Sequence, residues 1–251
     1  MEKMEDVTFD QLITVDKPEI FLESAQPFMK LMMQYQCAML EIQTKFQVLN
    51  AELSLDSDQN PIETISCRLK KPISIIEKLK RKNFEVTVEN IEKHLQDVAG
   101  VRVICSFPRD IYILADKICS QDDIRLIAKK DYIQKPKKNG YRSLHLILEV
   151  PVFFSNETKP MKVEVQLRTI AMDLWASIEH KIKYKKEIKR DSRKMERELC
   201  LCAEQLHRVD LRMQEIGQEI EKENENVVED KSGCPFAPGI STIAEMNLEE
   251  E

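Results

Sequence analysis

Two carboxylates stand in blocks rich in basic and aromatic residues, and these residue types suit the transfer of a phosphate-derived group. Asp97 opens the segment DVAGVRVIC, and Glu164 lies within VEVQLRT. Carboxylates can hold Mg²⁺ or accept a proton, cationic side chains hold and neutralise phosphates, and an aromatic ring can stack on a base. Asp97 and Glu164 are therefore the candidate reacting and metal-binding groups.

The basic residues are concentrated in two segments, although the chain as a whole has a formal net charge of −6. Residues 67–82 carry seven bases and one acid, and residues 129–142 carry six bases and one acid. Residues 221–251, in contrast, carry nine acids and two bases. This sorting fits a polyanionic ligand of limited size better than a long nucleic acid. The alternative is that the charges belong to solvated helix faces.

Local spacing adds two details to these basic segments. Ser74 and Lys78 are one helical turn apart and share a face with Lys71, so together they could grip one polyphosphate. Gly140 allows a tight turn directly before Tyr141, which could lift the aromatic ring out of a strand surface.

Three segments rich in β-branched or alternating apolar residues predict strands: 101–107, 141–150 and 162–168. The last two alternate, so each has one face for the core and one polar face. The polar faces carry Tyr141, Ser143 and His145 in one strand and Glu164, Gln166 and Arg168 in the other. One such face could simply meet solvent, but two consecutive ones favour a lined cleft.

Apolar residues at helical spacing predict helices at 28–49, 72–82, 109–120, 169–186 and 192–222, and Thr87 is a credible N-cap for a short helix over 87–97. The 192–222 helix carries an unbroken heptad seam formed by Met195, Leu199, Cys202, Leu206, Val209, Met213, Ile216 and Ile220. The seam could pack against 28–49 or against a helix of another subunit, and we favour a homo-oligomer. The acidic segment 224–251 is predicted to be disordered.

The spacing of Asp97 and Arg102 creates a conflict. The two residues are five apart, so one continuous strand would place them on opposite faces. We therefore expect the chain to turn near Ala99–Gly100, which leaves Asp97 at the entrance of the strand. Two plainer interpretations stay open: Asp97 could simply end the preceding helix, and His145 could be an ordinary sheet histidine.

Composition excludes several classes of protein. The 251 residues contain no apolar run close to the roughly 20 residues that a membrane span needs. The polar, acidic start has no signal-peptide core, and the seven cysteines include no Cys-x-x-Cys pair. We expect a cytoplasmic protein without a membrane segment, a zinc ribbon or a disulfide framework.

Taken together, these blocks resemble the synthetase domain of the RelA/SpoT homologue family over about residues 60–187. The resemblance rests on DVAGVRVIC, NGYRSLH, VEVQLRT and a tryptophan-containing helix that ends in IEHKIKYK, in that order and spacing. The size of the chain is similar to that of the small alarmone synthetases. The implied fold is α+β, a nucleotidyltransferase-like mixed sheet of about five strands flanked by helices, with long N- and C-terminal helices.

The resemblance also suggests a division of the chain. Residues 1–59 would form an N-terminal helical region and 60–190 the synthetase domain. Residues 191–223 would form a C-terminal helix that is a candidate for oligomerisation, and 224–251 the disordered acidic tail. Only 67 residues precede Arg68 and they contain no histidine for a metal site, so we expect a chain that synthesises alarmones without the family's hydrolase domain.

The activity implied by the resemblance is transfer of pyrophosphate from ATP to the 3′-hydroxyl of GDP or GTP. The products would be AMP and ppGpp or pppGpp, the signalling nucleotides of the stringent response. Mg²⁺ is the implied cofactor, and a homo-oligomer, with a tetramer favoured, is the implied assembly. The alternatives are a catalytically silent nucleotide- or RNA-binding oligomer and, less favoured for an acidic chain, a nucleotidyltransferase acting on RNA ends.

Roles follow from the resemblance residue by residue. Arg68 and Arg102 would sandwich the adenine, while Lys70, Ser74 and Lys78 would hold the ATP phosphates. Asp97 would bind Mg²⁺, and Glu164 would activate the 3′-hydroxyl or share the metal. The guanine-nucleotide side would be formed by Lys137, Asn139, Tyr141, His145, Gln166 and Arg168, with Tyr141 stacked on the guanine.

An effector is a further expectation from the resemblance. Some relatives bind one beside the positions that match Glu63, Thr64 and Ser66. The aromatic residue expected there is absent from this sequence. Its absence disfavours activation by pppGpp. The sequence does not decide whether single-stranded RNA or pppGpp acts as an effector.

Overall fold

The structure is a computed structural model that describes residues 18–56, 60–184 and 192–232, with side chains for 25–55, 60–182 and 194–223. Its helices are α2 (Pro18–Asp56), α3 (Pro72–Arg81), α4 (Val88–His94), α5 (Pro108–Cys119), α6 (Ile170–Tyr184) and α7 (Ser192–Ser232). Its strands are β1 (Ile62–Leu69), β2 (Ala99–Cys105), β3 (Arg125–Asp131), β4 (Leu144–Phe153) and β5 (Thr158–Thr169). The described residues up to Gln214 form one compact unit, and a second unit begins at Glu215.

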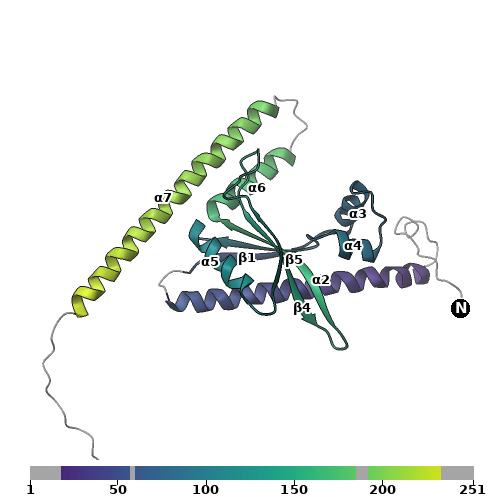
Figure 1. The fold of residues 1–251 in the computed structure, drawn as a ribbon. Coiled ribbons are helices and arrows are strands. Elements are labelled where there is room, and N and C mark those ends of the chain that lie inside the picture. The colour runs from purple at the N-terminus through teal and green to yellow at the C-terminus, as the bar shows by residue number, and fades with distance from the viewer. Residues whose placement is uncertain (1–17, 57–59, 185–191, 233–251) are drawn as a thin grey trace, which may run out of the picture. The chain divides into compact units, whose positions relative to one another are not determined.

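The strands form one mixed sheet (Figure 1), and their order is β1-β2-β5-β4-β3. β2 and β5 run parallel, and the other neighbours are antiparallel. The α+β fold with a mixed five-stranded sheet is thereby confirmed. The register aligns one row of polar residues across four strands: Ser66 on β1, Arg102 on β2, Gln166 on β5 and His145 on β4.

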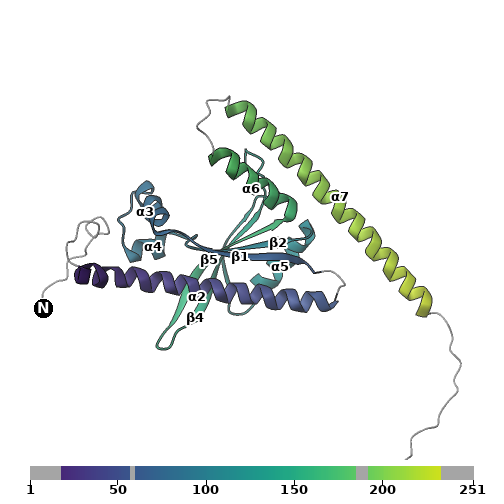
Figure 2. The ribbon, with the colours of Figure 1, turned by 180° about the vertical axis from the view of Figure 1, so that it is seen from behind.

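The helices α2 and α5 cover one face of the sheet and bury the core there. Ile42 and Phe46 of α2 are fully buried, and side chains of this size contribute roughly 1.5–3 kcal/mol each when buried. The view from behind shows α2 running across the strands (Figure 2). Because α2 takes the apolar face, the polar residues of the strands are left on the opposite face.

Two strands, β1 and β3, were not predicted from apolar pattern, which gave only three. Both lie at the edges of the sheet, where one side of the strand has no neighbour. Edge strands carry charged and polar residues that discourage pairing with other chains. The sequences IETISCRL and RLIAKKD follow this rule, so their apolar alternation is weak.

Several boundaries differ from the expected ones. The helix predicted at 28–49 extends over Pro18–Asp56, and α7 continues beyond residue 223 to Ser232. The expected turn at Ala99–Gly100 is wrong, because both residues lie within β2. α4 ends at His94, and the chain turns before residue 99, which still leaves Asp97 at the entrance of the strand.

Residues 1–17, 57–59, 185–191 and 233–251 lie outside the described part of the chain. They include the ends of the predicted N-terminal region and most of the predicted acidic tail. Within the described residues, each helix is too short or too polar to span a bilayer.

Candidate active site

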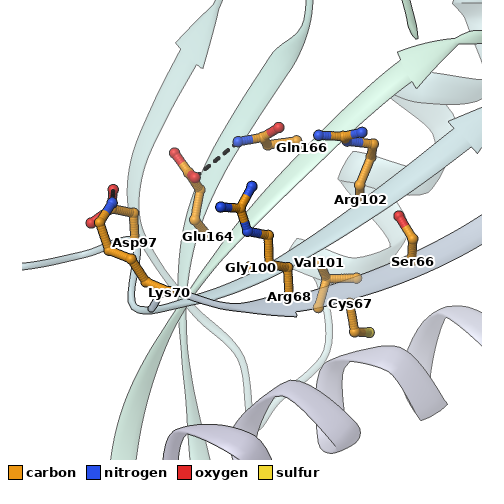
Figure 3. A pocket seen from close by; sticks show the side chains of 10 residues that line it. All are labelled: Ser66, Cys67, Arg68, Lys70, Asp97, Gly100, Val101, Arg102, Glu164 and Gln166. Carbon is orange, nitrogen blue, oxygen red and sulfur yellow. Dashed lines mark hydrogen bonds and ion pairs between the residues drawn. The ribbon is translucent and has the colours of Figure 1, made fainter. Parts of the chain in front are cut away.

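A cavity of about 520 Å³ opens on the polar face of the sheet, over β1, β2 and β5 (Figure 3). It is lined by Ser66, Cys67, Arg68, Lys70, Asp97, Gly100, Val101, Arg102, Glu164 and Gln166. Six of the predicted catalytic and nucleotide-binding residues are in this lining, including both candidate carboxylates. Asp97 and Glu164 therefore face one common space although 66 residues separate them along the chain.

The open floor of the cavity depends on Gly100. The register places Gly100 between Arg68 on β1 and Glu164 on β5. Because glycine has no side chain, the space between the arginine and the carboxylate stays open. The neighbouring Cys67 has its sulfur directed to the other face, 3.4 Å from Gln43 Oε1 of α2.

Asp97 is held by two lysines at the entrance of the cavity. Its Oδ2 accepts hydrogen bonds from Lys70 Nζ at 2.7 Å and from Lys78 Nζ at 2.6 Å. Burial raises the pKa of Asp97, but these lysines outweigh burial and leave the pKa below its ordinary value. The other oxygen, Oδ1, is buried and has no hydrogen-bond partner within the described residues. The site therefore presents an ionised carboxylate with one oxygen available to a ligand.

Ser74 and Lys78 both lie on α3, as the sequence suggested. The helix begins at Pro72, and its last turn is basic. Lys78 reaches Asp97, whereas Ser74 is half-buried one turn earlier and is outside the cavity lining.

Glu164 has a partner for each of its oxygens. His145 Nδ1 is 3.3 Å from Oε1, and Gln166 Nε2 donates to Oε2 at 2.9 Å. Burial and the nearby Asp97 charge raise the pKa of Glu164, but His145 and Gln166 lower it more, so the pKa lies below its ordinary value. Glu164 is thus an ionised, oriented carboxylate.

An aromatic cluster adjoins Glu164 on the side of β4. Tyr141 Oη is 2.8 Å from His145 Nε2, and the two rings meet edge to face. Lys137 Nζ lies 4.6 Å from the ring centre of Tyr132 and 4.5 Å from that of Tyr141. The structure therefore joins the predicted guanine-side residues Tyr141, His145 and Lys137 to the candidate base.

Arg168 and Arg102 meet at one carboxylate that the sequence analysis missed. Asp173, in the first turn of α6, accepts a hydrogen bond from Arg168 NH1 at 2.9 Å, and its Oδ1 is 3.3 Å from Arg102 NH1. Burial and the charge of Arg168 lower the pKa of Arg102. Asp173 raises it by less, so the pKa of Arg102 lies below its ordinary value. Arg168 is only 5% exposed, and its NH1 and NH2 nitrogens donate to groups inside the protein, whereas its buried Nε has no hydrogen-bond partner within the described residues.

Two further residues were not singled out. Asn139 Nδ2 donates to Glu179 Oε1 of α6 at 3.0 Å, so Glu179 holds one of the predicted guanine-side residues in place. Tyr132 lies within the basic segment 129–142, where an aromatic residue among lysines is a signal that could have found it. Glu179 lies within the block IEHKIKYK that supports the family resemblance, whereas no pattern in the sequence distinguishes Asp173 from the other acids of the helices.

Helix α7 holds the loop that carries Tyr141. Gly140 packs against Cys200 and Ala203, and Arg142 NH2 donates to Glu204 Oε2 at 3.0 Å. The buried side chains of this stretch are Ala203 and Asp210, which lie outside the predicted seam. The seam residue Val209 is exposed, whereas the seam residues Leu199 and Leu206 are half-buried, so packing within the chain uses a face of α7 that only partly overlaps the seam.

The carboxylates of this site fit a metal ion whose coordination shell is completed by substrate. Within the described residues, no group of three or more His, Cys, Asp or Glu side chains is arranged to hold a metal. Mg²⁺ commonly takes one or two carboxylates and fills its remaining positions with waters and phosphate oxygens. Asp97, with its unpartnered buried oxygen, and Glu164 meet that demand.

Comparison with known proteins decides the family. A family model described as "Region found in RelA / SpoT proteins" matches residues 67–189. GTP pyrophosphokinase YwaC of Bacillus subtilis (strain 168) is 45% identical over 188 residues, which cover 74% of this chain and 89% of that protein. The chain belongs to the RelA/SpoT family.

Solved structures of RelA/SpoT family members share the fold. Small alarmone synthetase 2 from Bacillus subtilis matches with a TM-score of 0.69 and 42% identity, over 76% of this chain and 98% of that one. Small alarmone synthetase 1 from the same organism, bound to its product pppGpp, matches with a TM-score of 0.70 and 33% identity, over 78% and 98%. The chain is thus a RelA/SpoT enzyme of the GTP pyrophosphokinase class and resembles the small alarmone synthetases.

Proposed function

We propose that the protein transfers pyrophosphate from ATP to the 3′-hydroxyl of GDP or GTP, releasing AMP and forming ppGpp or pppGpp for stringent-response signalling. The observation that carries the proposal is the shared cavity of Asp97 and Glu164, with cationic residues on one side and the Tyr141 cluster on the other. A protein that only bound polyanions would gain nothing from two ionised carboxylates in its cleft. The pppGpp bound to the similar synthetase 1 supports the same product class here.

The ATP side of the site is assigned to the basic half of the cavity. Arg68 and Arg102 project from neighbouring strands and would flank the adenine, because guanidinium planes stack well on purines. Lys70 and Lys78, already gathered at Asp97, would hold the polyphosphate together with Ser74. The ammonium groups of these lysines would then contact both the Asp97 carboxylate and the phosphates.

The guanosine side is assigned to the loop before β4 and the polar face of β5. Tyr141 would stack on the guanine, and Lys137, Asn139 and His145 would place the nucleotide, with Gln166 and Arg168 behind them. Glu164 would accept the proton of the 3′-hydroxyl, which is a poor nucleophile without a base. Asp97 and Glu164 would hold Mg²⁺, which when bound supplies charge neutralisation at the phosphates under attack.

The direct test is product formation. Purified protein with Mg²⁺, ATP and GDP is expected to form AMP and a nucleotide with more phosphates than GDP, separable by anion exchange. Parallel reactions with GMP and GTP define the acceptor. Formation of ADP alone would contradict the proposal, and nucleotide binding without any product would favour the catalytically silent alternative.

We further propose that the protein is a homo-oligomer, with a tetramer favoured. α6 exposes a stripe of large apolar residues one helical turn apart, and α7 exposes others outside its contact with the sheet. The exposed large apolar residues of the two helices, among the described side chains, are Ile170, Leu174, Ile178, Ile182, Leu201, Val209, Leu211, Met213, Ile216 and Ile220. Faces of this kind are typical of subunit contacts.

Val209→Asp is expected to lower the mass of the protein in solution, because a carboxylate in an apolar contact must be desolvated without a partner. Light scattering measures the mass. Val48→Asp is the matched control, since Val48 of α2 is 59% exposed and Val209 is 57% exposed. An unchanged mass for the folded Val209 variant would show that this part of α7 does not form a subunit contact.

A further inference from the structure

Two hydrogen-bonded paths run from Arg168 to the two oxygens of Glu164. Arg168 NH2 donates to Tyr141 Oη at 2.6 Å and to Gln166 Oε1 at 3.0 Å. Tyr141 continues through His145 to Glu164 Oε1, and Gln166 continues directly to Glu164 Oε2. We propose that Arg168 is a positioning residue that orients Glu164 through both paths and sets the tautomer of His145.

The direction of the first path follows from what each group can donate. A guanidinium only donates, so the Tyr141 oxygen accepts from Arg168. The ionised Glu164 only accepts, so His145 Nδ1 carries a proton and donates it to that carboxylate. In the neutral ring, Nε2 is then unprotonated and accepts the single phenolic proton of Tyr141, whose oxygen already accepts from Arg168. The neutral Nδ1–H tautomer satisfies every link of the path.

The second path is equally determined. Gln166 stands between a group that only donates, Arg168, and a group that only accepts, the ionised Glu164. Its amide must therefore turn its oxygen to Arg168 and its nitrogen to Glu164, as the structure has it. Both oxygens of the carboxylate are thus held by donors whose own orientation depends on Arg168.

Asp173 completes the arrangement as the counter-ion of Arg168. Arg168 is 5% exposed, and a buried guanidinium without an opposite charge is strongly unfavourable. Arg168 NH1 donates to Asp173 Oδ1, which also pairs with Arg102 on the proposed ATP side. Asp173 is therefore a second positioning residue, because it keeps Arg168 in the geometry that both paths need.

The tautomer of His145 can be measured without any substrate. The protein has four histidines, so ¹⁵N-labelled histidine gives few signals, and the signal lost in His145→Gln identifies His145. At about pH 8.5, where an ordinary histidine is neutral, we expect the Nδ1–H form. The Nε2–H form predominates in free neutral histidine, so the expected result is diagnostic. An Nε2–H form or an imidazolium at this pH would overturn the proposal.

Kinetics test the effect on Glu164. Arg168→Lys keeps the charge but loses the planar fork, and we expect kcat to fall by about 10- to 100-fold, as for other partners that orient a reacting ligand. The KM for ATP should stay nearly unchanged, and His145 should lose its Nδ1–H preference. Arg125→Lys on edge strand β3, where Arg125 pairs with Glu149, is the matched control and should leave kcat unchanged.

Asp173→Asn gives a second, milder variant, because the Asp173 side chain is 27% exposed and asparagine has the same shape. It should lower kcat in the same direction as Arg168→Lys. If Arg168→Lys does not fold, the wild-type tautomer and Asp173→Asn decide the question. Wild-type kcat in folded Arg168→Lys or in Asp173→Asn would contradict the positioning role.

The kinetic part rests on the proposed function, whereas the tautomer measurement does not. If the wild-type protein forms no product but His145 carries its proton on Nδ1, the proposed function fails and the hydrogen-bonded paths stand. If product forms and His145 is an Nε2–H tautomer, the proposed function stands and the inference fails.

Discussion

Glu164→Gln is expected to lower kcat by about 10²–10⁴-fold, the range typical of losing a general base. The change removes the negative charge that would accept the proton of the 3′-hydroxyl. It also places an amide NH₂ where one of the two donors, His145 or Gln166, now points. Because the pKa of Glu164 lies below its ordinary 4.5, the carboxylate is ionised at neutral pH, so the loss should be seen across that range.

The measurement is AMP formation under saturating ATP and GDP, alongside direct binding of a non-hydrolysable ATP analogue. Binding should survive, because the proposed ATP contacts come from the arginines and lysines. Glu157→Gln, in the loop joining β4 and β5, is the same chemical change at an exposed position paired with Lys30, and should leave kcat unaltered. A Glu164→Gln enzyme within tenfold of wild type would show that Glu164 is not the base.

The side chains that the strands direct into this site could be predicted from sequence, because alternation along a strand depends only on neighbouring residues. The period of two in 162–168 put Glu164 and Gln166 on one face, and both line the cavity. The roles of the companion residues Arg68 and Arg102 came from the family resemblance. For Arg68 the strand pattern was weak, because the apolar alternation of β1 covers only Ile65, Cys67 and Leu69. Asp97 was predicted to lie at the entrance of the strand, because one continuous strand would have put Asp97 and Arg102 on opposite faces of the sheet.

The contacts that join the two halves of the site could not be predicted. Asp173 reaches Arg102 and Arg168 only because β2 and β5 pair in parallel and deliver both arginines beside the first turn of α6. The buried face of α7 was also missed, because the heptad pattern counts large apolar residues. The residues buried are the small Ala203 and Asp210. Burial raises the pKa of Asp210 to about 6, and its Oδ2 is 2.5 Å from the Thr169 hydroxyl at the end of β5.

Gly140→Ala is expected to destabilise the protein by about 2–4 kcal/mol, the sum of two separate costs. Gly140 has φ +91°, a conformation that disfavours any residue with a Cβ. A Cβ built there would also lie 2.7 Å from Ala203 Cβ and 3.2 Å from Cys200 Cα of α7. Because Tyr141 follows directly, relief of this contact should displace the proposed guanine-stacking ring and raise the KM for GDP far more than that for ATP.

A double-mutant cycle separates the two costs. Ala203→Gly removes the methyl group that the new Cβ would meet, at an expected cost of about 1 kcal/mol for glycine in a helix. If α7 restrains the loop, the double variant should be more stable to urea than the two single losses predict, by about 0.5–3 kcal/mol. The cost of the positive φ, the 3.2 Å approach to Cys200 Cα and the cost of glycine in the helix should remain. Gly100→Ala is the matched stability control, since a Cβ there meets its nearest atom at an ordinary 3.5 Å. Strict additivity would mean that the loop and α7 respond independently, and the GDP defect would then come from backbone strain at residue 140 alone.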